Sequence, residues 1–228
     1  MGSVSARGLR RLQLLEGDLL PESRMQTLWT AVTAAKAQEG ASPLLQFGTS
    51  FHRRGVEPLA RFLESSCAHV RALQLDLRVD SSWQEQDAAE ALQRTGFSLS
   101  SCRSLRTLTL SLDAPSRPES SNIAVGAALL RTAARNTALE DVVIIIDNLL
   151  DRCFETPGVV ERFNTLEQSM LNLPHVQRVD LVLAPSDLLA HLPSRVNDIS
   201  STVDMLKKHL PRLQQSNRIK TTWTGLNT

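Results

Sequence analysis

The chain has 228 residues, of which 42% are hydrophobic and 21% are charged. This composition is typical of a globular protein that buries a sizeable core. Lys and Arg (25) nearly balance Asp and Glu (24), which gives a formal net charge of +1. Nucleic-acid-binding proteins carry a basic excess, and single-strand binders also use aromatic stacking platforms. Since aromatic residues make up only 4% of the chain and tyrosine is absent, we expect no nucleic-acid partner.

The three cysteines, Cys67, Cys102 and Cys153, are too few and too far apart for a disulfide framework. No apolar run approaches the roughly 20 residues that a membrane-spanning helix needs. Residues 1–15 lack the uninterrupted apolar stretch of a signal peptide. We therefore expect a cytoplasmic or nuclear protein without a membrane partner.

Expected strands and helices alternate along the whole chain. Strands are expected at residues 8–14, 43–47, 69–77, 104–112, 138–146, 175–183 and 218–223, and helices at residues 22–38, 54–66, 82–96, 120–136, 156–173 and 197–210. The helices show apolar stripes at helical spacing or caps at their ends. Gly96, for example, is expected to end one helix, and Thr156 followed by Pro157 to begin another.

Four of the expected strands repeat one pattern, in which alternate residues are apolar. The steps from Leu73 to Leu108, Val142 and Val179 are 35, 34 and 37 residues. Long helical crossovers permit parallel pairing of successive strands. Polar residues alternate with the leucines, so one sheet face is expected to pack on helices and the other to stay open. We predict an α/β solenoid, with a curved parallel sheet of six or seven strands and helices on one face.

The block from Leu105 to Leu110 reads Leu-x-x-Leu-x-Leu and resembles the strand segment of leucine-rich repeats. With the long helical crossovers it is similar to the ribonuclease-inhibitor-like class, and most of all to the leucine-rich portion of fungal F-box-like proteins. The resemblance covers residues 8–223 and implies a single repeat domain over residues 1–228, with about seven units of roughly 35 residues. Asp113 and Asp147 stand near the place where family repeats carry Asn or Cys, and no F-box module is recognised before the repeats.

Motifs for enzymatic chemistry are absent from the sequence. No phosphate-binding loop, dinucleotide fingerprint or nucleophile elbow follows an expected strand. The histidines lack metal-ligand spacing, and the shared register of Cys67 and Cys102 suits buried structural thiols. Asp80, Asp113 and Asp147 would follow adjacent strands, either as caps of the next turns or as ligands of a divalent cation. We expect no enzyme activity, cofactor or metal. The alternative is a doubly wound α/β enzyme with a metal-dependent site at that sheet edge.

The outward strand residues predict a protein-binding face. The first row would hold Gln13, Gln46, Gln74, Thr109, Val143, Asp180 and Lys220, and the second Asp76, Ser111, Ile145, Val182 and Thr222. Val143, Ile145 and Val182 form an apolar patch between polar flanks, which is typical of interaction sites. The alternative is that another part of the chain, or a missing domain, covers this face. The strand at residues 142–146 is apolar at every position, so it is both the exception to the pattern and the expected centre of the face.

Overall fold

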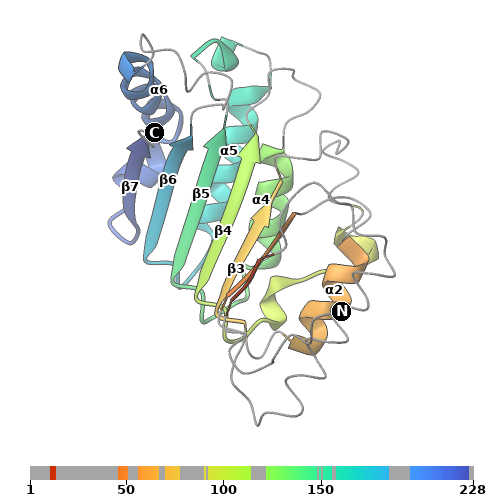
Figure 1. The fold of residues 1–228 in the computed structure, drawn as a ribbon. Helices are drawn as coiled ribbons and strands as arrows, with labels where there is room; N and C mark the ends of the chain where they lie inside the picture. Colours follow the sequence, from red (N-terminus) through yellow and green to blue (C-terminus); the bar gives the residue numbers. More distant parts are fainter. Residues whose placement is uncertain are drawn as a thin grey trace.

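The computed structural model describes residues 11–13, 46–50, 56–66, 70–77, 90, 92–113, 122–147, 149, 151–155, 158–184 and 196–225, with backbone alone in the first two segments. From residue 46 onward, a helix or a 3₁₀ turn lies between each strand and the next (Figure 1). The strands are β1 (Arg11–Gln13), β2 (Gln46–Ser50), β3 (Ala72–Asp76), β4 (Thr107–Asp113), β5 (Asp141–Asp147), β6 (Arg178–Ala184) and β7 (Lys220–Gly225). The helices are α2 (Val56–Ser66), α4 (Ile123–Thr132), α5 (Val159–Leu171), α6 (Val196–His209) and α7 (Pro211–Gln215), with 3₁₀ turns at Leu99–Ser101 and Asp151–Glu155.

The described strands form one parallel sheet whose order follows the sequence from β1 to β7. Figure 1 shows α4, α5 and α6 on the same face of this sheet. The predicted α/β class and the parallel sheet are therefore confirmed. A doubly wound sheet reverses its strand order at a switch point, and the described strands contain no such reversal. The described strands therefore do not have the doubly wound order on which the alternative enzyme interpretation was based.

The core lies between the sheet and the helix layer. Alternate strand side chains point into it because successive residues of a strand face opposite sides. Each fully buried leucine or isoleucine contributes about 1.5–3 kcal/mol relative to an exposed one. The inward strand residues are Leu73, Leu75, Leu108, Leu110, Leu112, Val142, Ile144, Ile146, Val179, Leu181 and Leu183, all of them buried. The apolar period-two pattern of the sequence is therefore the pattern of this core.

The observed helix ends agree less closely with the predicted ones than the observed strands agree with the predicted strands. Gly96 has a φ of 63°, and its N–H and that of Phe97 bond back to the carbonyls of Gln93 and Leu92, so the predicted glycine stop is confirmed. The predicted start of α5 at Thr156 is wrong. That helix begins at Val159, after Gly158 with a φ of 80°. The helix expected at residues 22–38 and the first part of that at residues 82–96 lie outside the described residues.

Helix α4 packs very closely on strand β4 at Gly126. A Cβ built on Gly126 would lie 3.0 Å from a methyl carbon of Leu112, which is itself fully buried. We expect Gly126→Ala to lower the free energy of unfolding by about 1 kcal/mol, because an overpacking cost of about 1–3 kcal/mol exceeds a helix-propensity gain of about 1 kcal/mol. Urea unfolding measures the change.

A double-mutant cycle separates this clash from other effects of the alanine. In a Leu112→Ala background the obstructing side chain is gone, so the same Gly126→Ala change is expected to be neutral or stabilising. Equal destabilisation by Gly126→Ala in both backgrounds would show that Leu112 is not the cause.

Candidate functional face

Two rows of side chains cross the outward face of the sheet, opposite the helix layer. Strand pairing aligns Gln74, Thr109, Val143 and Asp180 in the first row and Asp76, Ser111, Ile145 and Val182 in the second. The alignment arises because the apolar pattern has the same register in each of these four strands. The sequence had predicted both sets of neighbours, and the strand register agrees with it.

The ends of the predicted rows need correction. Gly48 is the partner of Gln74, and Thr222 is the partner of Asp180. Gln46 and Lys220 instead align with Ala72 and Arg178, two residues earlier along their neighbouring strands. Thr222 therefore belongs to the first row and not to the second. Gln13 pairs with Gly48 and so keeps its predicted place in the first row. The second and last strands follow poorer copies of the apolar pattern, so spacing alone misplaced Gln46 and Lys220 by two residues.

Exposure varies across the face. The apolar residues Val143, Ile145 and Val182 are half-buried and retain part of their surface, as do Gln74, Thr109 and Asp180. Asp76 and Ser111, however, have only 8% and 1% of their surface exposed. The prediction that these two side chains are accessible to a partner is therefore wrong for this structure. The partly exposed residues of the face thus lie on β3 to β6, with the exposed Thr222 on β7. We call Val143, Ile145 and Val182 the apolar patch.

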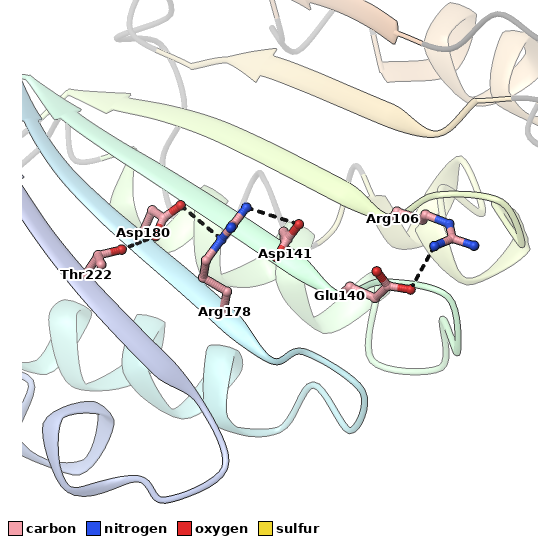
Figure 2. Close-up of polar contacts among 6 residues, drawn as sticks. All are labelled: Arg106, Glu140, Asp141, Arg178, Asp180 and Thr222. Atoms are coloured by element: carbon pink, nitrogen blue, oxygen red, sulfur yellow. Dashed lines mark hydrogen bonds and ion pairs between the residues drawn. The ribbon is translucent and has the colours of Figure 1, made fainter.

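A chain of polar contacts, drawn in Figure 2, lies on β5, β6 and β7, and β5 and β6 also carry the apolar patch. The Arg178 guanidinium lies 3.2 Å from a carboxylate oxygen of Asp141 and 3.3 Å from one of Asp180. Thr222 donates its hydroxyl hydrogen to Asp180. These contacts tie β5, β6 and β7 together at the amino-terminal end of the outward face. Because Arg178 keeps 50% of its side chain exposed, the pairs contribute at most about 1 kcal/mol each to stability.

Sequence reasoning missed this chain of contacts, although its members follow the outward period-two register. Asp141 and Arg178 are partners across the strands, and each stands two residues before a predicted face residue. The apolar pattern marks the centre of each strand and does not single out the charged residue at its start.

The carboxylates at the opposite edge of the sheet do not form a recognisable metal centre. Asp113 and Asp147 are register partners at the carboxyl-terminal ends of β4 and β5, whereas Asp80 lies outside the described residues. Within the described ranges, no group of three or more His, Cys, Asp or Glu side chains is placed to hold a metal ion. Cys102 and Cys153 are buried, and Cys67 is not among the described residues.

A buried asparagine joins two repeats, a role that no sequence pattern indicated. Asn136 donates its amide hydrogens to the carbonyls of Leu99 and Cys102, at 3.1 and 2.9 Å, and accepts the N–H of Ala138 at 2.9 Å. It thereby anchors the turn before β5 to the 3₁₀ turn of the preceding repeat. Asn136 therefore links the segments that lead into β4 and β5, two strands of the outward face.

The fold and the face define a parallel α/β protein whose sheet is covered by helices on one side and is partly accessible on the other. No protein-family model, curated protein or solved structure matches this chain. Among the described helices, none is long and apolar enough to cross a membrane.

Proposed function

We propose that the chain is a protein-interaction scaffold, a leucine-rich-repeat-like solenoid that binds a protein partner through the outward face of its sheet. The observation that carries the proposal is the apolar patch of Val143, Ile145 and Val182, which stays half-exposed on a sheet face bordered by threonines and ion pairs. Solvent-exposed apolar surface with a polar border is the usual form of a partner-binding site.

The arrangement of the repeats supports a binding role. Successive parallel strands place equivalent side chains side by side, so a partner meets a continuous surface built from several repeats. The Leu-x-x-Leu-x-Leu blocks resemble those of F-box-like proteins, and by that resemblance we propose the substrate-recognition part of such an adaptor. We also propose a cytoplasmic or nuclear setting, because the three cysteines of the sequence are too few and too far apart for a disulfide framework.

The test is affinity capture with the full chain from extracts of its source cells, quantified by mass spectrometry. We expect the Val143→Asp/Ile145→Asp variant to recover at least about tenfold less of the partner than the unmodified chain, because burying a charge in an apolar interface costs about 2 kcal/mol or more.

The matched control is Val160→Asp, which introduces the same change at a half-buried valine of α5, on the helix layer. Near the start of a helix an aspartate is tolerated by the helix dipole. Thermal unfolding establishes that the variants remain folded. Undiminished recovery by a folded Val143→Asp/Ile145→Asp variant, or an equal loss with Val160→Asp, would contradict the proposal.

A further inference from the structure

Strand β7 lies at one edge of the sheet, as Figure 1 shows. Within the described part of the chain, its strand neighbour is β6 alone. The Lys220 N–H donates to the carbonyl of Gln177, just before β6, at 2.8 Å. Because the backbone groups of successive strand residues point to opposite sides, the N–H and C=O groups of Thr221 and Trp223 point away from β6, along the outer edge.

The β7 edge carries few of the features that keep sheet edges from pairing. Such features include very short strands, prolines, bulges and charged side chains. Strand β7 has six residues, contains no proline and stays in unbroken register with β6, and Lys220 is its one charged residue. At the opposite edge, β1 has only three residues. The β7 edge is therefore the better template for an added strand.

The side chains of β7 suit such a strand. Thr222 and Thr224 are exposed on the outward face, and Trp223 is half-buried against the core on the helix side. Threonine and tryptophan are common in strands, and contacts of threonine and aromatic side chains across strands stabilise a sheet. A strand added at this edge would cover the exposed part of the indole and pair the outward backbone groups.

A second copy of β7 is complementary to this edge. In an antiparallel pair whose two-fold axis passes at Thr222, this residue would face its own copy, Thr221 would face Trp223, and Lys220 would face Thr224. This register leaves Gly225, a residue type that weakens strands, outside the paired segment. No like charges meet in it, and a net charge of +1 gives little repulsion between two copies.

We propose that the chain forms a homodimer in which two β7 strands pair antiparallel and join the two sheets into one. A two-fold axis perpendicular to the sheet keeps both helix layers on the same side. The strands meet at the sheet edge, so the apolar patch on the outward face stays uncovered. The dimer therefore does not rest on the proposed function, and the two proposals can fail separately.

The test measures the dimerisation constant of the full chain by sedimentation equilibrium over a series of concentrations. Thr221→Pro removes an N–H that β6 does not use, and proline is tolerated in an edge strand where the N–H faces solvent. We expect this variant to dimerise at least about tenfold more weakly than the unmodified chain. The matched control, Thr221→Ala, also loses the hydroxyl contact with the Leu213 carbonyl but keeps the N–H, so it should dimerise normally.

A pair of charge variants at the exposed Thr224 tests the register. In the proposed dimer, residue 224 faces Lys220 of the second copy, so Thr224→Glu creates opposite-charge pairs and Thr224→Lys creates like-charge pairs. We expect the glutamate variant to dimerise roughly tenfold more tightly than the lysine variant, and this difference to shrink as salt rises.

Three results would overturn the proposal: a monomer at every concentration, an undiminished dimer of a folded Thr221→Pro variant, or equal dimerisation of Thr224→Glu and Thr224→Lys. Thermal unfolding establishes that each variant is folded. The Thr224 variants decide the outcome by themselves if the proline variant does not fold.

Discussion

Replacing Phe163 by alanine is expected to lower the free energy of unfolding by about 3–5 kcal/mol, as is typical for removal of a fully buried aromatic ring. Phe163 is the largest fully buried side chain of the described core. Its ring centroid lies 5.3 Å from that of Phe154, which in turn stacks on the ring of His209 at 4.4 Å. The cavity would therefore weaken the contact among α5, the 3₁₀ turn Asp151–Glu155 and α6.

Urea unfolding followed by circular dichroism measures this loss, and an unchanged slope would show that the unfolded state is the same. Asn164→Ala is the matched control, since Asn164 is the exposed neighbour on the same helix, and should change stability by no more than about 0.5 kcal/mol. A loss below about 1 kcal/mol for Phe163→Ala would mean that the ring is not part of a close-packed core.

Asn136→Ala is expected to lower the free energy of unfolding by about 3 kcal/mol. This is the second-largest effect that we predict. The change removes the side-chain donor to the carbonyls of Leu99 and Cys102, which keep the backbone N–H groups of Cys102 and Leu105, and it leaves the N–H of Ala138 without its acceptor. Each lost hydrogen bond costs about 0.5–1.5 kcal/mol, and a polar group left unsatisfied costs about 1–3 kcal/mol. Chemical denaturation of the unmodified chain and of the Asn136→Ala variant measures the difference in the free energy of unfolding.

Asn136→Asp distinguishes hydrogen bonding from side-chain size. The aspartate is of nearly equal volume and still accepts the N–H of Ala138, but it cannot donate to the two carbonyls. We expect it to be at least as destabilising as the alanine at neutral pH. Near-normal stability of Asn136→Asp would show that the inter-repeat hydrogen bonds from the amide nitrogen contribute little.

The strands were the most predictable part of the fold. Residues such as Leu108, Leu110 and Leu112 follow the period of two that a half-buried strand requires, and the repeat spacing indicated which strands are neighbours. Helix starts were less predictable, because Thr156 and Pro157 have strong local preferences for a helix start while the chain turns at Gly158. The short helix α7 was not predicted. Pro211 lies directly after residue 210, where the preceding helix was expected to end, so the sequence did not distinguish a second helix there.

The binding face was predictable in its membership but not in its accessibility. Strand register follows from the repeat spacing. Val143 could therefore be placed beside Thr109 in one row, and Ile145 beside Val182 in the other. The burial of Ser111 depends on what lies over it in space, which a repeat pattern does not encode. The partners of Asn136 lie 34 and 37 residues earlier, and no local pattern connects such residues.

The central claim, that the outward face meets a protein partner, is tested most directly by site-specific photocrosslinking in cells. A benzoylphenylalanine replaces Val143 in one sample and Val160, on the helix layer, in another. We predict that light produces a discrete protein adduct from position 143 and none from position 160. Adducts from position 160 alone, or none from position 143 in a folded chain, would contradict an interaction surface on the open face of the sheet.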